Sequence, residues 1–267
     1  MSDRLELPSG GTAFGASPSF VELLRRERPE AVAPLTQTDH AALTLPHGTT
    51  VLGLKYADGM LMAGDRRATA GNLIADAKMK KVFAADDYSA IAIAGAAGQA
   101  IEMVKLFQLE LEHYEKITGD RLSLEGKANR LAQLIRQNFP LAMQGLVVVP
   151  LFGGFDTRRN EGRIFYYDAT GGRWEEDDFQ TTGSGSLPAK NSLKKRWRPG
   201  LTRDEAVRVA VEALIDAADD DAATGGPDPA RGIYPVLLAV TARGAEEVAE
   251  ADVAAGVAAV VEERSSR

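Results

Sequence analysis

Residues 47–81 read HGTTVLGLKYADGMLMAGDRRATAGNLIADAKMKK, and the rest of the chain is organised around this stretch. β-Branched and apolar residues from Thr50 to Tyr56 predict a strand. Asp58-Gly59 is a strong hairpin signal, and Met60 to Gly64 predicts the returning strand. Thr49 stands before this hairpin and directly after a glycine, where one cleavage would make it the first residue of a new chain.

The bulk composition narrows the classes of protein that the chain could belong to. Its 267 residues suggest one or two domains, and a net charge of −7 argues against a broad nucleic-acid surface. The chain has no cysteine, which excludes disulfides, cysteine nucleophiles and thiolate metal sites. No apolar run approaches the roughly 20 residues needed to span a bilayer, and the N-terminus has no signal-peptide pattern. We therefore expect a cytoplasmic protein.

Histidine is scarce, which limits the catalytic chemistry that the chain can perform. Only His40, His47 and His113 are present, and they do not form an H-E-x-x-H zinc motif. The sequence also lacks the G-x-S-x-G elbow of many serine hydrolases. We expect no metal and no cofactor.

The pattern of periodic segments predicts strands, then helices, then strands, then helices and a last strand. This order is not a regular alternation of strand and helix, so it predicts an α+β architecture in which helix pairs cover antiparallel sheets. In the first half of the chain we expect strands within 49–95, then helices over 96–119 and 123–139, the second with Ser123 as its N-cap. Strands within 146–182 follow, with one over 173–182, and then a basic helix through 190–196. The last expected elements are a helix that starts at a Thr202–Glu205 capping box, a strand over 233–240 and a weak Ala/Val-rich helix over 248–267. Residues 66–72 are expected to form a polar turn.

Two further interpretations concern the ends of the chain. Residues 1–48 are broken repeatedly by glycine and proline, which is typical either of a disordered tail or of a propeptide that ends at Gly48. We expect the propeptide, followed by a single catalytic domain over residues 49–267 with a weakly ordered C-terminal tail.

A threonine hydroxyl becomes a nucleophile only when a nearby base takes its proton. The free α-amine of an N-terminal residue has a reference pKa of about 7.7–8.0, so it can serve as that base near neutral pH. Cleavage after Gly48 would therefore supply nucleophile and base in one residue, Thr49. The alternative reading of Gly48-Thr49-Thr50 is a loop that leads into a strand.

An acid and a lysine follow at positions that the strands can bring back to Thr49. Hairpin pairing around Asp58-Gly59 places Asp65 near the Thr49 end of the sheet, and Lys81 opens the next strand. A charged lysine there would favour loss of the hydroxyl proton. The alternative is a solvated acid in a turn and a surface lysine.

Several blocks of the sequence together resemble the β subunits of proteasomes, most closely the actinobacterial type with its long propeptide. The resemblance covers roughly residues 47–240. The blocks that carry it are Gly48-Thr49-Thr50, Gly64-Asp65-Arg66-Arg67, Lys81, Gly95, Gly183-Ser184-Gly185-Ser186 and Asp221-Ala222-Ala223-Thr224-Gly225-Gly226. The resemblance implies a four-layer αββα sandwich of antiparallel sheets, the fold of N-terminal-nucleophile hydrolases.

The resemblance also implies a role for each matching residue. Thr49 would be the nucleophile of a threonine endopeptidase, and Asp65 and Lys81 would tune it. The backbone N–H of Gly95 would donate to the oxyanion. The supporting residues would be Ser184, Asp221 and Thr224, the last standing where the family usually has serine. Thr69 and Ala97 would align the substrate backbone, and Met79, Ile93 and Ala97 would line an apolar pocket that favours cleavage after bulky apolar residues.

Assembly is implied by the resemblance alone. Two heptameric β rings, with 14 copies of this chain, would stack between rings of a separate α subunit. Self-cleavage between Gly48 and Thr49 would mature the enzyme during assembly. An ATPase ring would act through the α ring and deliver unfolded protein substrates, which would carry a small protein modifier as a tag.

Three other readings compete with this one. The simpler hexameric threonine protease of bacteria shares Thr-Thr and Gly-Asp, but not the long N-terminal segment or the Arg66-Arg67 pair. A catalytically silent ring subunit would be expected to lack Thr49, Lys81 or Gly48. A phosphate-cradling loop at 183–185 has no accompanying nucleotide-binding fingerprint. Asp219 and Asp220 could bind an ion, although surface charges at a helix end are the expected reading.

Overall fold

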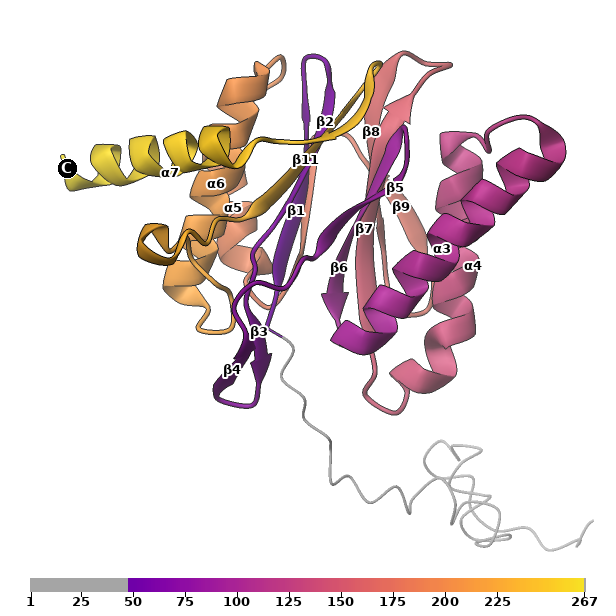
Figure 1. Ribbon diagram of the computed structural model, residues 1–267, viewed down its shortest axis with the longest axis horizontal. Coiled ribbons are helices and arrows are strands. Elements are labelled where there is room, and N and C mark those ends of the chain that lie inside the picture. The colour runs from indigo at the N-terminus through magenta and orange to yellow at the C-terminus, as the bar shows by residue number, and fades with distance from the viewer. Residues whose placement is uncertain (1–47, 267) are drawn as a thin grey trace, which may run out of the picture. The chain divides into compact units, whose positions relative to one another are not determined.

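The computed structural model describes residues 48–266, which build a protein of four layers (Figure 1). Two five-stranded sheets face each other, and helices cover the outer face of each sheet. Every strand pairing in the two sheets is antiparallel. The predicted α+β class and αββα layer order are confirmed.

The first sheet has the strand order β10-β1-β2-β11-β12, with β1 and β2 forming the predicted hairpin. Its strands are β1 (Thr50–Tyr56), β2 (Gly59–Gly64), β10 (Phe179–Gly183), β11 (Val236–Thr241) and β12 (Gly244–Glu247). Its outer face is covered by α5 (Ser186–Arg196), α6 (Arg203–Asp220) and α7 (Glu250–Ser265). Helix α6 begins at the predicted capping box, in which Thr202 and Glu205 each accept the other's backbone N–H.

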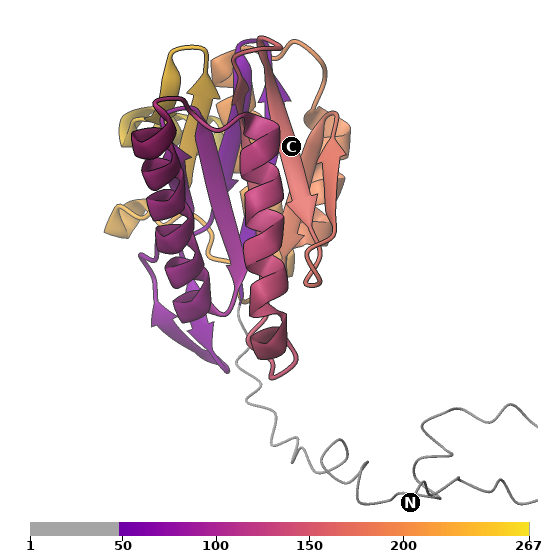
Figure 2. The same ribbon diagram turned by 90° about the vertical axis from the view of Figure 1, so that its right-hand side faces the viewer.

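The second sheet has the strand order β5-β6-β7-β8-β9. Its strands are β5 (Val82–Asp86), β6 (Ser89–Gly95), β7 (Val148–Asp156), β8 (Glu161–Tyr167) and β9 (Arg173–Glu176). Helices α3 (Ala97–Thr118) and α4 (Leu124–Ala142) run side by side over its outer face (Figure 2). The hydroxyl of Ser123 caps α4, as the sequence predicts.

Side chains that alternate along each strand divide the core into three layers. Leu52 and Leu54 of β1 point towards α5 and α6, whereas Val51 points towards the other sheet. Between the sheets, Val51 packs with Met62 and Ala92, and all three are fully buried. This alternation is the period of two that a strand buried on both faces must satisfy.

The structure corrects the predicted strand over 173–182. Residues 173–176 form β9 of the second sheet, and residues 179–183 form β10 of the first sheet. The chain therefore crosses between sheets within this stretch. The crossing matters for the site because it places Ser184 at the edge of the first sheet, beside the start of β1.

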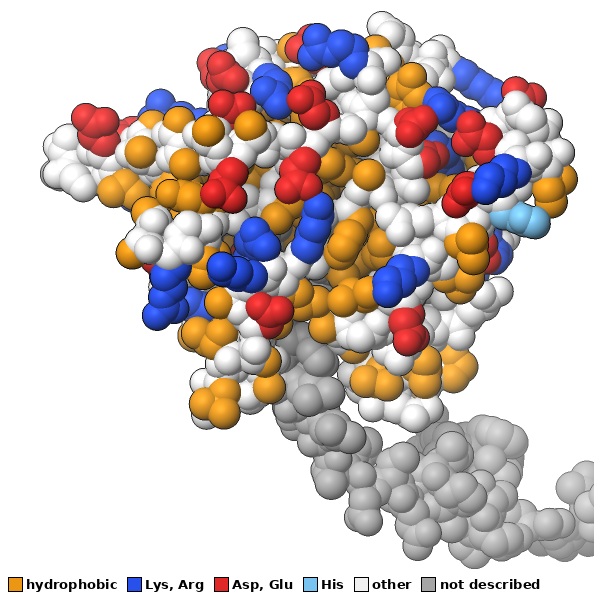
Figure 3. Space-filling model, viewed as in Figure 1, with side chains coloured by type: hydrophobic (Ala, Val, Ile, Leu, Met, Phe, Trp, Pro, Cys, Tyr) orange, Lys and Arg blue, Asp and Glu red, His pale blue; other side chains and the backbone are white. Residues whose placement is uncertain are grey.

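The predicted polar turn over 66–72 was also wrong. A separate two-stranded hairpin occupies this region, with strands β3 (Ala68–Ala70) and β4 (Leu73–Asp76). Leu73 and Ile74 are 74% and 57% exposed. Hydrophobic side chains are visible at this hairpin on the molecular surface (Figure 3).

The C-terminal stretch forms helix α7, which confirms the helix predicted there from the Ala/Val-rich sequence. Val253, Val257 and Val260 are buried against α6 and the first sheet. Arg264 adds ion pairs to Asp216 and Asp219 of α6.

Within residues 48–266, no helix has the length and hydropathy that crossing a membrane requires. The expected propeptide falls almost entirely outside the described residues, which begin at Gly48.

Candidate active site

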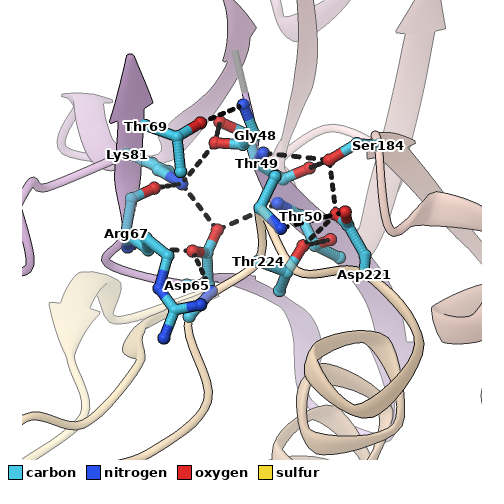
Figure 4. Close-up of polar contacts among 12 residues, drawn as sticks. Gly48, Thr49, Thr50, Asp65, Arg67, Thr69, Lys81, Ser184, Asp221 and Thr224 are labelled. Atoms are coloured by element: carbon cyan, nitrogen blue, oxygen red, sulfur yellow. Dashed lines mark hydrogen bonds and ion pairs between the residues drawn. The ribbon is translucent and has the colours of Figure 1, made fainter. Parts of the chain in front are cut away.

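Thr49 lies at the end of the first sheet, immediately before β1, and is only 5% exposed. On one side, β1 pairs with β10, with Thr50 opposite Gly183. On the other side it pairs with β2, with Val51 opposite Gly64. The turns that follow β10 and β2 therefore flank Thr49, and they carry Ser184 and Asp65 (Figure 4).

Hydrogen bonds surround the peptide bond between Gly48 and Thr49. The Thr49 hydroxyl donates to the carbonyl oxygen of Gly48 at 2.6 Å. The Thr49 backbone N–H donates to Ser184 Oγ at 3.2 Å, and the Gly48 N–H donates to Thr69 Oγ1 at 3.2 Å. While Gly48 remains attached, the Thr49 nitrogen is an amide and cannot act as a base.

A buried ion pair lies beside this peptide bond. Lys81 Nζ donates to Asp65 Oδ1 at 2.7 Å, and the two side chains are 2% and 0% exposed. The same ammonium donates to the carbonyl oxygens of Arg67 at 2.6 Å and Gly48 at 3.4 Å. Burial lowers the pKa of Lys81 from its ordinary value, although the neighbouring Asp65 carboxylate opposes that shift.

The carboxylate of Asp65 connects three segments of the chain. Its Oδ1 accepts the backbone N–H of Thr50 at 2.9 Å. Its Oδ2 accepts the N–H of Arg67 at 2.9 Å and that of Gly225 at 2.8 Å. Asp65 thus ties the start of β1 and the turn after β2 to the loop that follows α6.

The loop that follows α6, residues 221–226, contributes a second cluster. Asp221 Oδ2 accepts the hydroxyls of Ser184 at 2.5 Å and Thr224 at 2.6 Å. Burial disfavours ionisation of Asp221, but these two hydrogen bonds hold its pKa below the ordinary value. The Thr224 and Thr50 hydroxyl oxygens are 2.6 Å apart, so Thr50 donates to Thr224 when Thr224 donates to Asp221.

A mostly apolar cavity opens next to Thr49. It is lined by Gly48, Thr49, Ala68, Thr69, Met79, Lys81, Ile93, Ala94, Gly95, Ala97 and Ala100. The predicted substrate-binding residues all line it, as does Gly95, the predicted oxyanion donor. Ser184, Asp221 and Thr224 lie outside this lining and reach Thr49 through the Ser184 hydroxyl.

The structure also adds residues that the sequence did not single out. The hydroxyl of Thr50 belongs to the Asp221 cluster, and Arg67 supplies the carbonyl that binds Lys81. Ala223 lies so close to Gly48 that a Cβ at position 48 would be 1.9 Å from its Cβ. Both Thr50 and Arg67 belong to the motifs quoted above, but nothing in the sequence shows which of their atoms face the site.

Two residues that the sequence offered as possible ligand sites, Asp219 and Gly183, make other contacts in the structure. Asp219, considered as an ion ligand, pairs with Arg264 at 2.9 Å. Gly183, considered as part of a phosphate loop, packs against the carbonyl of Thr49, where an added Cβ would be 2.0 Å from the oxygen. The 183–185 turn therefore belongs to the surroundings of Thr49.

Comparison with known proteins identifies relatives along almost the whole chain. A family model described as "Proteasome subunit" matches residues 45–228. "Proteasome subunit beta" of Acidimicrobium ferrooxidans is 50% identical over 267 residues, covering 99% of this chain and 97% of the relative. "Proteasome subunit beta" of Streptomyces griseus subsp. griseus is 54% identical over 244 residues, covering 89% of this chain and 85% of the relative.

Proposed function

Because this chain belongs to the proteasome subunit family and is a β-type member of it, we propose that it is a threonine endopeptidase of the proteasome core particle, with Thr49 as nucleophile. The observation that carries the proposal is that the Thr49 hydroxyl and a buried ion pair meet at the same peptide bond. Its hydroxyl contacts the carbonyl of Gly48, and the buried pair of Lys81 and Asp65 adjoins the same carbonyl. Burying an ammonium is costly because the charge loses its hydration. The position of Lys81 beside Thr49 is therefore better explained by a catalytic role than by a threonine that merely begins a strand.

The chain matures by cleaving itself between Gly48 and Thr49. The Thr49 Oγ1 attacks the Gly48 carbonyl carbon, the C–N bond breaks, and the hydroxyl proton ends on the departing nitrogen. Water then hydrolyses the resulting ester, which leaves a carboxylate on Gly48 and a free amine and hydroxyl on Thr49. Support comes from the Gly48 carbonyl oxygen, which lies 2.6 Å from Thr49 Oγ1 and accepts a hydrogen bond from Lys81 Nζ, because that charged donor polarises the carbonyl.

The mature site then performs the same chemistry on other chains. The freed Thr49 amine takes the hydroxyl proton, Oγ1 attacks a substrate carbonyl, and the peptide C–N bond breaks as the proton passes to the departing amine. Water then hydrolyses the acyl ester, which releases the acyl group as a carboxylate and restores the Thr49 hydroxyl. Lys81 stabilises the ionised oxygen, the Gly95 N–H donates to the oxyanion, and Ser184 with Asp221 holds the amine. Asp65 fixes Lys81, and Thr224 fixes Asp221.

The cavity beside Thr49 binds the substrate residue that precedes the cut. Ala68, Met79, Ile93, Ala97 and Ala100 give it an apolar lining. Apolar surface removed from water is worth about 25 cal/mol per Å², so bulky apolar residues are favoured there. Thr69 lines the cavity as well and aligns the backbone of the bound peptide.

The proposed assembly is supported by the same family membership. The chain forms heptameric rings with further copies of itself and stacks on rings of an α subunit. Substrates enter as unfolded chains, delivered by an ATPase ring and marked by a protein modifier. Residues 1–48 are the propeptide, which is removed when the ring is complete.

The test is coexpression with the α subunit, followed by intact mass and N-terminal sequencing of the β chain. We expect a new N-terminus at Thr49 and hydrolysis of peptides with an apolar residue before the cut. Thr49→Ala should abolish both and leave assembly intact. A fully assembled particle whose β chain retains residues 1–48 would refute self-cleavage and favour a catalytically silent subunit.

A further inference from the structure

The side chain of Arg67 connects the strand end that carries Asp65 to the loop that carries Asp221 (Figure 4). Its Nη1 donates to the carbonyl oxygen of Ala222 at 2.9 Å. Gly225 packs against the stem of the same side chain, where an added Cβ would be 2.7 Å from Arg67 Cβ. We propose that the Arg67 guanidinium is a positioning residue that fixes the 221–226 loop against Thr49, an inference that rests on the proposed function.

The backbone and the side chain of Arg67 serve two different parts of the site. Its carbonyl oxygen accepts from Lys81 Nζ at 2.6 Å, and its N–H donates to Asp65 Oδ2 at 2.9 Å. Neither bond involves the guanidinium. A substitution that keeps the backbone in place therefore removes the connection to the loop and leaves the surroundings of Lys81 intact.

The loop that Arg67 holds reaches Thr49 by two routes. Ala223, next to the bound carbonyl, packs directly against Gly48. Asp221, on the other side of that carbonyl, binds Ser184, which accepts the Thr49 N–H. A shift of the loop would therefore move the scissile bond and the Ser184 hydroxyl together.

The other contacts of the loop hold its two ends and leave its middle, at Ala222, for Arg67 to fix. Gly225 N donates to Asp65 Oδ2 at 2.8 Å, which fixes the far end of the loop, and Asp221 follows the end of α6. Ala222 is exposed and lies between these two points. Among residues 48–266, two side chains hydrogen-bond to the backbone of residues 222 and 223. Arg67 does so from outside the loop, whereas Asp221 belongs to the loop itself.

The experiment compares Arg67→Gln, Arg67→Lys and the matched control Arg136→Gln in the assembled particle with its α subunit. Arg136 makes a similar connection far from Thr49, because its Nη1 donates to the Gly171 carbonyl at 2.9 Å and Gly171 packs against its stem. Three quantities are measured: the rate at which the Thr49 N-terminus appears, kcat and KM per processed chain, and the thermal unfolding midpoint.

We expect Arg67→Gln to slow both processing and kcat by about tenfold, because small displacements of catalytic groups are costly. KM should stay within about twofold, since Arg67 does not line the substrate cavity. Arg67→Lys should restore most of the rate, because one ammonium donor suffices for one carbonyl. Arg136→Gln should have the wild-type rates.

Each remaining outcome has a defined meaning. If Arg67→Gln lowers the unfolding midpoint but retains the wild-type kcat and processing rate, the residue is merely structural and the inference is overturned. If Arg67→Lys is as slow as Arg67→Gln, a hydrogen bond to Ala222 is not the cause, which also overturns it. If the wild-type particle shows neither a Thr49 N-terminus nor Thr49-dependent hydrolysis, the proposed function fails first, and the inference fails with it.

Discussion

At the scale of single residues, the ammonium of Lys81 has three protons to donate and three acceptors around it. Asp65 and the carbonyls of Arg67 and Gly48 take them. Release of the Gly48 carbonyl on cleavage would free one donor for the Thr49 hydroxyl. A buried ammonium that changes partner in this way can serve both the cleavage of the chain itself and the later hydrolysis of peptides.

Lys81→Arg tests this reading while preserving the charge. The planar guanidinium is larger than the ammonium and cannot reach the same three acceptors in a fully buried position. We expect processing and peptide hydrolysis to fall by at least about a hundredfold. Lys80→Arg is the control, because Lys80 is exposed and pairs with Glu247. A processed and active Lys81→Arg variant would contradict the role assigned to Lys81.

Asp221 predicts a pH dependence of stability. Its pKa is held below the ordinary value, so the ionised carboxylate stabilises the folded state above the unfolded pKa of about 3.9. That contribution is lost as the pH falls through the lower folded pKa. Thermal unfolding should therefore show Asp221→Asn less stable than wild type at pH 7, with the difference shrinking below about pH 4. Asp220→Asn is the control for the loss of one carboxylate, because Asp220 is an exposed neighbour of Asp221.

At the scale of elements, the turn after β10 limits how Thr49 can be placed. Gly183 has φ +103°, a region that residues with a Cβ rarely adopt. Its Cα also lies against the Thr49 carbonyl, so the turn can approach β1 this closely only with glycine. The position of Ser184 beside Thr49 depends on this close approach.

Gly183→Ala should therefore impair the site more than backbone strain alone would. The new methyl group would meet the Thr49 carbonyl oxygen at 2.0 Å and push Thr49 or β10 aside. We expect N-terminal sequencing to show little or no processed chain. Gly200→Ala is the matched control, because Gly200 has φ +75° but no atom near its would-be Cβ. Equal processing of the two variants would mean that the contact with Thr49 is unimportant.

At the scale of the whole molecule, the packing of one sheet on the other holds the two halves of the site together. Thr49, Asp65 and Ser184 come from the first sheet and its turns, whereas Lys81 directly precedes β5 and Gly95 ends β6 in the second sheet. The apolar layer between the sheets sets the distance between these groups. Its integrity therefore affects both stability and the geometry around Thr49.

Met62→Ala tests the contribution of this layer to stability. Met62 is fully buried between the sheets, and truncating a buried methionine to alanine costs about 2–5 kcal/mol. The midpoint of urea unfolding of the full chain should fall accordingly, with an unchanged slope. Met143→Ala is the control, because Met143 is 73% exposed and should cost little. A loss below about 1 kcal/mol for Met62→Ala would mean that the layer repacks readily.

Local patterns in the sequence determined those parts of the molecule that depend on near neighbours along the chain. The Asp58-Gly59 turn fixed the register of β1 and β2, and with it the placement of Asp65, 15 residues from Thr50 in the chain but hydrogen-bonded to it. The apolar periodicity of α3 and the caps of α4 and α6 could also be predicted from the sequence. Each depends only on residues a few positions apart, which either bury one helix face or hydrogen-bond the free backbone groups at a helix end.

Only the tertiary structure decided which distant segments meet at Thr49. Ser184 is 135 residues away, and it arrives there because the chain changes sheets between β9 and β10, a step that the sequence interpretation missed. The Gly225 N–H is 160 residues from Asp65, and the Arg67 guanidinium selects the loop carbonyl of Ala222. Residue patterns indicate whether a strand is buried, but the choice of sheet and of hydrogen-bond partner depends on long-range packing, which those patterns do not encode.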